Sequence, residues 1–556
     1  MMKVSARQWF RQGHPWVWLN AGAVAISMTM VFGLLGFIAV KGVSHFWPKS
    51  LVEFDYTTPE GKVEPILGEF LDRETVSAER LRQTHVALAS KVEFVERVQV
   101  KVGNRDVTGR DFRWVLNDYI TAPRYPEQAT VFERREWGNF YGYPIGILEN
   151  GQPIPASPED VWPMLSERLA RALALHDSIR TIEVSEIGRV NYEIEKWRLK
   201  RKAHELNHTY TAERQAEFAA QQARFDTEYK TLQAQLRTLY QEIKRDALVV
   251  ETVDGQQKVL EVGRLVRAYQ PNNMSGWAKA LLYVERLREF VFDEPREANT
   301  EGGVFPAIFG TVTMVMVMSI IVTPFGVVAA IYLREYATQG PLTRAIRIAV
   351  NNLAGVPSIV YGVFGLGFFV YAIGGSIDQV FYQESLPSPM FGTPGLLWAA
   401  LTLALLTVPV VIVATEEGLA RIPRAVREGS LALGATKAET LWRVVLPMAS
   451  PAIMTGLILA IARAAGEVAP LMLVGVVKLA PNLPMDFNAP FIHLERKFMH
   501  LGFHIYDVGF QSPNVEAARP LVYATAFLLV AVIAVLNLSA VMVRNRLRER
   551  YKSLEH

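Results

Sequence analysis

The stretch Glu428-Gly429-Ser430-Leu431-Ala432-Leu433-Gly434 continues through Val444-Val445-Leu446-Pro447 and leads into an apolar run from Pro451 to Val477. Gly434 can adopt backbone angles that separate two short helices. Pro447 has no backbone N–H and should prevent the connector from continuing as a helix into the apolar run. We therefore expect a helix-turn-helix connector between two long apolar segments.

Long apolar runs with almost no charge are the main feature of the chain. Hydrophobic residues make up 50% and charged residues 20% of the sequence, so bulk composition suits either a large soluble protein or a membrane protein. Runs near or beyond about 20 residues are long enough to cross a hydrocarbon core. Six runs are of this kind, at about Trp16 to Val40, Phe305 to Leu333, Ile346 to Ile373, Gly395 to Ala414, Pro451 to Val477 and Leu521 to Val543. We expect a mainly α membrane protein with six transmembrane helices, the first an uncleaved helix because it is too long for a signal peptide.

Basic residues in the connectors predict the orientation of these helices. They lie before the first run, in two connectors and in the tail: Lys3, Arg7 and Arg11; Arg334, Arg344 and Arg347; Arg421, Arg424, Arg427, Lys437 and Arg443; Arg544, Arg546, Arg548, Arg550 and Lys552. The connector from Gly374 to Pro394 has no Lys or Arg. Because cytoplasmic loops carry the excess of positive charge, we expect both termini (within 1–44 and 544–556) in the cytoplasm and 45–303 in the periplasm. The core of five helices would then span 304–543.

The long polar segment should be a domain of its own. Short β-type runs at about 51–154 predict a small mixed-sheet part, and strands resume at about 247–270 around the turn dipeptide Asp254-Gly255. Between them, at about 157–246, breakers are few and apolar residues follow the spacing of a coiled-coil seam: Phe218, Phe225, Tyr229, Leu232, Leu236, Leu239 and Ile243. A helical hairpin packed on itself gives this pattern, and so does a surface for partner docking. We expect an α+β periplasmic domain with the helical part inserted into a strand-containing unit.

Several functions are excluded by composition. The formal charge of +3 is small and the basic residues are dispersed, so we expect no nucleic-acid partner. There is no cysteine, hence no disulfide framework and no thiolate metal site, and we expect neither metal nor cofactor. The one Gly-Lys pair, Gly61-Lys62, is followed by Val63 and lacks the upstream glycine of a phosphate-binding loop. The chain should therefore not hydrolyse ATP by itself.

Two charged residues lie inside the fifth apolar run. A helix that starts at Pro451 would carry Arg463 to about 18 Å depth, where an arginine is costly unless it faces a partner or a water-filled path. Glu467 would follow one turn later on the same face and could pair with it. Arginine suits a phosphate oxyanion because it offers parallel donors to two oxygens. A structural ion pair between helices explains the two residues equally well.

The connector Glu428 to Pro447 resembles the EAA loop of ABC importer permeases, whose pattern is Glu-Ala-Ala, three residues, Gly, nine residues, Ile, one residue, Leu-Pro. Glu428, Gly434, Leu446 and Pro447 fall at the family spacing, with Gly429, Ser430 and Val444 as departures. The resemblance implies that this connector, at about 416–447, docks in a groove of a separate ATP-binding subunit and transmits its motion to the membrane helices.

A second resemblance points to phosphate. Arg463 to Pro470 is similar to the Arg-Ala-x-Gly-Glu-Thr-Ala-Pro motif of phosphate permeases, with Val468 in place of threonine. Three further stretches resemble the same family, most specifically Asn352 to Gly362, besides Gly302 to Thr311 and Pro324 to Ala337. The Pro306-Ala307-Ile308 opening is that of the PstA type. The resemblance spans Gly302 to about Val474 and does not extend to the domain between His45 and Gly302.

The resemblance implies a permease subunit of an ATP-driven phosphate importer in the bacterial inner membrane. Its partners would be a PstC-type permease subunit, two copies of the ATP-binding subunit and a periplasmic phosphate-binding protein. Arg463 and Glu467 would then line the phosphate pathway. A membrane-bound sensor is one alternative, although no cytoplasmic output domain follows Val543. A permease for molybdate, sulfate or phosphonate is the other. From its placement, the periplasmic domain would help dock the binding protein or rest against the partner permease.

Overall fold

Six helical runs of the computed structural model are long and apolar enough to cross a membrane. The structure describes residues 10–11, 13–58, 61–79, 93–157, 159–512 and 515–552; Lys3 and Arg7 of the predicted cytoplasmic N-terminus lie outside these ranges. The six runs within the described residues are His14–Phe46, Phe305–Tyr336, Ser358–Phe381, Leu396–Arg421, Lys437–Gly466 and Ala518–Glu549. Their number is the predicted one, and the chain is a multi-pass membrane protein.

The third span begins later than predicted. We expected a helix from Ile346, but α10 (Pro341–Leu353) is a separate helix, and the chain breaks before α11 (Ser358–Phe364). Pro357 explains the break, because it cannot donate to α10 and disfavours helical geometry in the residue before it. From α11 the chain continues through a π-helical segment, Gly365–Gly374, into α12 (Gly375–Phe381).

Three helices form the centre of the membrane part: α9 (Phe305–Ile331), α13 (Leu396–Arg421) and α16 (Leu446–Gly466). They approach closely where one of them carries glycine. A Cβ on Gly326 would lie 2.6 Å from Cγ1 of Val411, and one on Gly456 would lie 2.7 Å from Cβ of Ala414. Because lipid tails are as apolar as these side chains, close packing rather than burial from water holds such helices together.

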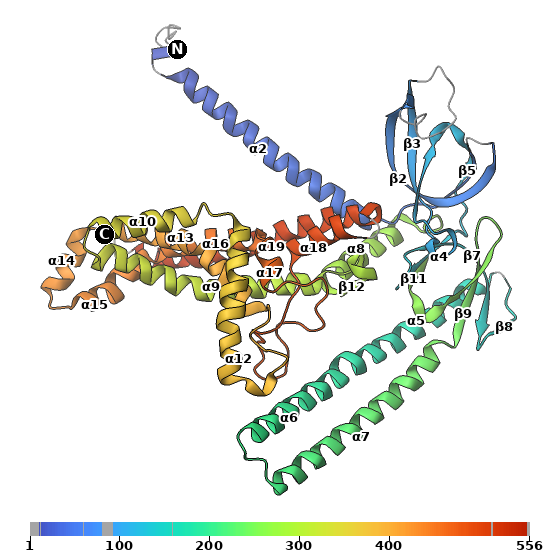
Figure 1. The fold of residues 1–556 in the computed structure, drawn as a ribbon. Coiled ribbons are helices and arrows are strands. Elements are labelled where there is room, and N and C mark those ends of the chain that lie inside the picture. The colour runs from blue at the N-terminus through green and yellow to red at the C-terminus, as the bar shows by residue number, and fades with distance from the viewer. Residues whose placement is uncertain are drawn as a thin grey trace.

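The first and last helices cross at one point. A Cβ on Gly42 of α2 (His14–Val43) would lie 2.8 Å from the backbone of Ala524 in α19 (Val515–Lys552). Beyond this crossing α2 leaves the other helices (Figure 1), and its most apolar window is 0% buried. The apolar surface of α2 is therefore available to lipid or to another subunit.

Two antiparallel sheets form the polar domain. The first has the order β4-β3-β2-β1-β5 and the second the order β10-β9-β7-β6-β11, with β8 paired to β7. The strands are β1 (Val52–Thr57), β2 (Val63–Ser77), β3 (Phe94–Lys101), β4 (Phe112–Leu116), β5 (Ile120–Arg124), β6 (Thr130–Arg134), β7 (Phe140–Glu149), β8 (Gln152–Ile154), β9 (Asp246–Glu251), β10 (Gln257–Glu261) and β11 (Leu265–Tyr269). The α+β character is confirmed. The expected mixed sheet is wrong, since every pairing between these strands is antiparallel. Short connections such as those of β1–β2, β6–β7 and β9–β10 allow only this pairing.

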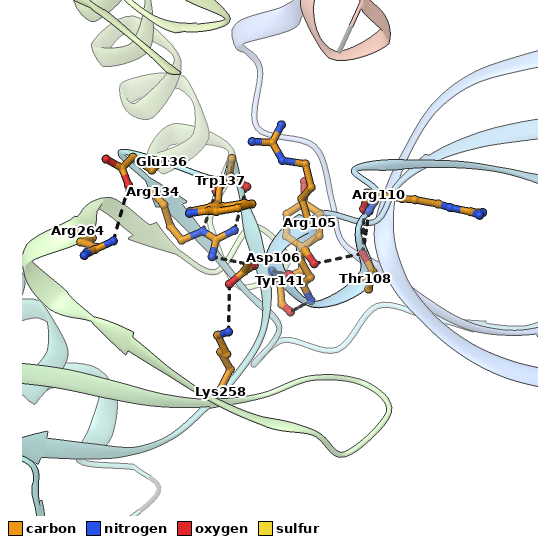
Figure 2. Close-up of polar contacts among 12 residues, drawn as sticks. Arg105, Asp106, Thr108, Arg110, Arg134, Glu136, Trp137, Tyr141, Lys258 and Arg264 are labelled. Carbon is orange, nitrogen blue, oxygen red and sulfur yellow. Dashed lines mark hydrogen bonds and ion pairs between the residues drawn. The ribbon is translucent and has the colours of Figure 1, made fainter. Parts of the chain in front are cut away.

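Ion pairs join the two sheets (Figure 2). The short helix α4 (Arg105–Thr108) lies between β3 and β4, and its Asp106 contacts Arg134 of β6 at 3.0 Å and Lys258 of β10 at 3.5 Å. Arg134 is buried and also donates to the carbonyl oxygen of Gly138 at 2.9 Å. Buried charges are stable when they are paired in this way, so α4 is fixed to the second sheet.

A long helical hairpin projects from the second sheet (Figure 1). One arm consists of α5 (Val161–Arg180), a π-helical segment, Thr181–Ile187, and α6 (Gly188–Leu206), and the other arm is α7 (Ala212–Ile243). Phe225 and Leu232 of the predicted seam are buried, and Phe218, Tyr229, Leu236, Leu239 and Ile243 are partly buried. The hairpin packs on itself, whereas coiled-coil winding stays a prediction.

The hairpin is an insertion in the second sheet, as predicted. It leaves after β8 and returns into β9, and β9 pairs with β7 on the other side of the insertion. The β9–β10 turn at Asp254-Gly255 is also confirmed, with Gly255 at a φ of 80°. Both ends of the hairpin are therefore held by one sheet.

The helix α8 (Gly276–Phe292) connects the second sheet to the ribbon of β12 (Pro295–Arg296) and β13 (Glu301–Gly302) that precedes α9. A buried network fixes α8 to the sheet: Glu133 of β6 accepts hydrogen bonds from Arg286 and, at 2.7 Å, from Arg267. Burial by itself would raise the pKa of the Glu133 carboxyl, but Arg286 and Arg267 lower it to about 2. The carboxylate is thus held in its charged form by two guanidinium groups.

Candidate functional site

A short helical hairpin lies at the end of the membrane part opposite the sheets (Figure 1). Its helices are α14 (Arg424–Ala432) and α15 (Lys437–Thr440), and Gly434 between them has a φ of 88°. Residues with a Cβ rarely adopt this left-handed conformation, so the predicted turn at Gly434 is confirmed. A capping box between Thr436 and Glu439 starts α15.

Hydrophobic burial and one arginine fix this short hairpin to the membrane helices. Leu441 and Val445 are buried with Leu419 and Ile422. Arg427 donates to the carbonyl oxygens of Leu419 and Ile422 at 2.7 and 2.8 Å and pairs with Glu335 at 3.0 Å. The two carbonyl groups belong to the C-terminal end of α13, where helices carry acceptors without intrahelical partners. A movement of α14 would thus be passed directly to α13.

Two large apolar side chains of the connector that contains the short hairpin are exposed. Leu433 is 90% exposed and Trp442 68%, and Glu428 also faces solvent. Large apolar side chains gathered at the end of a polar connector typically mark a protein interface. The sequence reasoning named Glu428 and Gly434 but missed Leu433 and Trp442. The available signal was their apolar character at positions of a connector that otherwise exposes charge.

Leu446 and Pro447 lie at the start of α16 and are partly buried. Our expectation that Pro447 stops the helix is wrong, because the helical run extends from Lys437 to Gly466. A π-helical segment, Leu441–Val445, precedes Pro447. Proline is tolerated in the first turn of an α-helix, where an N–H would lack an intrahelical acceptor, so the connector enters the membrane span as one helix.

Arg463 occupies the last turn of α16, and Glu467 follows the end of the helix. The expected continuation to Val477 is wrong: α16 ends at Gly466, and Glu467 has the extended angles φ −80° and ψ 133°. Nevertheless the two side chains pair, with Arg463 Nε 3.8 Å from Glu467 Oε1, and they are 33% and 21% exposed. A cation in the last turn also interacts favourably with the free carbonyl groups of the helix end. The pair therefore sits at a break in a membrane helix, partly accessible.

Two glycines hold the segment after Glu467 in place. A Cβ on Gly362 of α11 would lie 2.7 Å from Cα of Pro470, and a Cβ on Gly502 of α18 (Leu501–Tyr506) would lie 2.6 Å from Cγ2 of Val468. The stretch Asn352 to Gly362 singled out in the sequence therefore contacts the segment that follows the charged pair. By contrast, the structure does not bring Arg463 and the short hairpin together, since they lie at opposite ends of the run Lys437–Gly466, about 40 Å apart along the helix.

Comparisons with known proteins match the membrane part. Residues 322–549 match the family model "Binding-protein-dependent transport system inner membrane component". The chain is 35% identical over 244 residues to "Phosphate transport system permease protein PstA 1" of Mycobacterium tuberculosis (strain CDC 1551 / Oshkosh), covering 44% of this chain and 71% of that protein. It is 33% identical over 189 residues to "Probable phosphate transport system permease protein PstA" of Methanocaldococcus jannaschii, covering 34% and 60%.

Among solved structures, an inward-facing MetNI methionine ABC transporter matches with a TM-score of 0.32 and 19% identity, over 43% of this chain and 94% of that chain. The family model covers residues 322–549, from the second half of α9 into α19, and this part carries both the short hairpin and the charged pair. Because the sequence matches to the permease family and to its PstA members are this extensive, this chain belongs to the PstA-type permeases of binding-protein-dependent ABC importers.

Proposed function

We propose that this chain is the permease subunit through which an ABC importer moves inorganic phosphate across the inner membrane into the cytoplasm. The observation that carries the proposal is the Arg463–Glu467 pair at the broken end of α16. An arginine in a membrane helix is expensive and is retained where it serves a path or a partner. The names of the PstA relatives supply the substrate class.

The chemistry of the pair suits an oxyanion. The guanidinium group of Arg463 is always charged and can donate two parallel hydrogen bonds to phosphate oxygens. Its contact with Glu467 at 3.8 Å is longer than a hydrogen bond, so the donors of Arg463 remain available to a ligand. Glu467 would hold the empty site near neutrality and repel the anion once it is released.

Energy for transport would come from a separate ATP-binding subunit, present in two copies, which docks on the short hairpin. Glu428 lies in α14, and Gly434 lies at the turn between α14 and α15. Leu446 and Pro447 start α16. Closure of the ATP-binding subunits would push α14, and Arg427 would pass that movement to α13. Access to the segment near Arg463 would change in response.

The remaining partners and the orientation complete the proposal. A PstC-type permease would cover the exposed apolar surface of α2, and a periplasmic phosphate-binding protein would deliver the substrate. The connector that contains the short hairpin is rich in basic residues, including Arg424 and Arg443. Because cytoplasmic connectors carry the excess of positive charge, this end of the membrane part and both termini would be cytoplasmic, and residues 45–303 would be periplasmic.

The test is uptake of labelled phosphate, driven by ATP, into proteoliposomes that hold this chain with its partner subunits. Arg463→Ala should abolish uptake, Arg463→Lys should retain a part of it, and Arg344→Ala, which removes an exposed arginine from α10, should change nothing. Sulfate and molybdate should not compete. Uptake of sulfate or molybdate instead of phosphate would support the permease function and contradict phosphate as the substrate. Normal phosphate uptake by Arg463→Ala would show that the Arg463–Glu467 pair has a structural role only.

A further inference from the structure

The long hairpin contacts the membrane part at two loops that face α6. We call them the facing loops: residues 382–395, between α12 and α13, and residues 477–500, between α17 (Leu471–Val474) and α18. From α6, the hydroxyl of Tyr192 donates a hydrogen bond to the carbonyl oxygen of Ala489, and the ammonium group of Lys202 donates one to the carbonyl oxygen of Leu386. The ring of Tyr192 also packs edge-on against His493, with centroids 6.3 Å apart. One helix of the inserted hairpin therefore holds both loops.

The loop 477–500 is internally braced around His493. This side chain is 3% exposed, and its two ring nitrogens lie 3.0 Å from Asp486 Oδ1 and 3.2 Å from Glu495 Oε1. Arg496 pairs with Asp486 at 2.6 Å and donates to the carbonyl oxygen of Leu483 at 2.8 Å. A polar network of this kind, whose hydrogen bonds are made around a buried side chain, makes the loop rigid. A restraint at Ala489 therefore acts on the whole loop.

Backbone hydrogen bonds connect this loop to the segment that follows the charged pair. The N–H groups of Leu396 and Leu397 donate to the carbonyl oxygens of Arg496 and Leu494 at 2.9 and 2.8 Å. Next to them, the N–H of Gly395 donates to the carbonyl oxygen of Val474 at 2.9 Å. Val474 ends α17, which starts directly after Pro470. The chain of contacts thus runs from Tyr192 through the loop and the start of α13 to the neighbours of Glu467.

The loop 382–395 is tied down in a similar way. Asp378 of α12 accepts hydrogen bonds from the N–H groups of Phe391 and Gly392 at 2.9 and 2.6 Å. The indole N–H of Trp398 in α13 donates to the carbonyl oxygen of Phe391 at 2.7 Å. Lys202 therefore binds a loop that is hydrogen-bonded at Phe391 to both α12 and α13.

The opposite end of the hairpin is anchored. The first arm leaves the second sheet after β8, the second arm returns to it at β9, and Arg171 of α5 pairs with the buried Asp246 of β9 at 3.0 Å. A helical hairpin fixed at its root and bonded to loops along α6 can transmit a displacement of the sheet domain to those loops, because helices are stiff over such lengths.

From these contacts we propose that the long hairpin is a clamp on the facing loops, with Tyr192 and Lys202 as positioning residues that set access to the mouth of the transport path. The clamp deepens the proposed function, because it assigns regulation of that path to the inserted domain. The domain would thus act on its own chain, through backbone carbonyl groups of the loops.

The first test uses the absence of cysteine from the chain. Asn488→Cys places a single thiol next to Ala489, and its labelling rate by a membrane-impermeant maleimide reports how freely the loop moves. Tyr192→Phe together with Lys202→Met should raise this rate about tenfold, because two hydrogen bonds that hold the loops are lost. The single variant Lys202→Arg retains the Tyr192 hydroxyl and keeps a donor at position 202. Its labelling should be as slow as that of the parent chain.

Matched controls lie on the same hairpin. Tyr240→Phe removes a hydroxyl that donates to Glu183 within the hairpin at 2.6 Å, and Lys230→Met removes an exposed ammonium group of α7. Both should leave the labelling rate unchanged. We call Tyr192→Phe with Lys202→Met the clamp variant. Equal labelling rates in the clamp variant and in the parent chain would overturn the proposal.

The second test locks the clamp. Tyr192→Cys together with Asn488→Cys, bridged by a bifunctional thiol reagent that a reductant cleaves, should reduce phosphate uptake at least about tenfold, and cleavage by the reductant should restore uptake. Full uptake with the bridge complete would refute a role of the clamp in access. If the unbridged chain imports no phosphate, the proposed function fails, whereas the labelling experiment still decides the clamp.

Discussion

The two hairpins of this molecule lie at opposite ends of the membrane helices and are fastened in different ways. The short hairpin, α14–α15, is held by the Arg427–Glu335 ion pair and by buried apolar side chains that follow α15, such as Leu441 and Val445, whereas Leu433 and Trp442 are exposed. The long hairpin, α5–α7, is rooted by buried apolar side chains of α5 such as Val161 and Leu165 and by the ion pair of Arg171, and it reaches the facing loops with polar groups alone, a hydroxyl and an ammonium group. Apolar fastening is insensitive to pH, whereas fastening by charge is not. Four perturbations test this comparison.

The largest effect is expected at the base of the domain that carries the long hairpin. Glu133 has an ordinary pKa of 4.5 when unfolded, and its pKa in the fold is lowered to about 2. Since the folded pKa is depressed, the stability that Glu133 contributes is present above pH 4.5 and is lost as the pH falls from 4.5 toward 2. Glu133→Gln should cost about 3 kcal/mol at pH 7, because Arg267 and Arg286 lose their shared carboxylate.

Hydrogen exchange of the amides in β6 and β11 measures this loss of stability. In the parent chain these amides should exchange faster between pH 4.5 and 3, after correction for intrinsic rates, and in Glu133→Gln this dependence should be absent. Glu136→Gln is the control, because its partner Arg264 lies 3.6 Å away and both side chains are exposed. Unaltered exchange in Glu133→Gln would show that the network does not hold α8 to the sheet.

The second effect concerns the exposed face of the short hairpin. Leu433→Glu and Trp442→Glu change side chains that are 90% and 68% exposed, so the fold should tolerate both. If this face docks the ATP-binding subunit, either change should weaken the affinity by about 2 kcal/mol, roughly 30-fold, as central apolar anchors do. A titration of the purified permease complex with that subunit measures the affinity. Leu206→Glu, an exposed leucine at the end of α6, should have no effect, and an equal loss there would argue against a specific surface.

The turn of the short hairpin could be predicted from the sequence, whereas the contacts of the long hairpin with the facing loops could not. Gly434 marked the turn of the short hairpin because a left-handed φ requires a particular residue type, and Asp254-Gly255 marked the β9–β10 turn for the same reason. The clamp left no such mark, since its acceptors are carbonyl oxygens of Ala489 and Leu386, and every residue has one. Contacts made through the backbone are specified by the approach of two distant segments, and no local pattern records that approach.

The membrane helices also have features that the sequence predicts and features that it does not predict. Their number could be read from hydropathy, because about 20 apolar residues must appear together. The end of α16 at Gly466 could not, because the residues after it, Val468 to Val474, are apolar enough to extend the run. Packing of Pro470 against Gly362 replaces the helix there. The pairing of Arg463 with Glu467 was predicted, but the broken backbone that exposes it was not.

A third, smaller effect is expected at the elbow of the short hairpin. Gly434 has a φ of 88° with no atom within 4 Å of a Cβ built there, so a larger side chain meets strain but no clash. Gly434→Val should cost about 1–3 kcal/mol of local stability and reduce the coupling of ATP hydrolysis to uptake. The ratio of ATP hydrolysed to phosphate taken up measures the coupling. Gly429→Ala, in the helical part of α14 and also in open space, should be neutral or slightly stabilising, and a similar loss there would refute the role of the left-handed turn.

The smallest effect separates stability of the long hairpin from its grip on the loops. Thr211 caps α7 by accepting a hydrogen bond from the N–H of Arg214 at 3.4 Å. Thr211→Ala should destabilise this end of the hairpin by about 1 kcal/mol, and hydrogen exchange in the first turns of α7 should quicken about fivefold. The contacts of Tyr192 and Lys202 come from α6, so maleimide labelling at position 488 should change far less than in the clamp variant. If labelling instead rises as much as exchange does, the grip on the loops depends on the tip of the hairpin as a whole, and the two hydrogen bonds from α6 are not the elements that hold the facing loops.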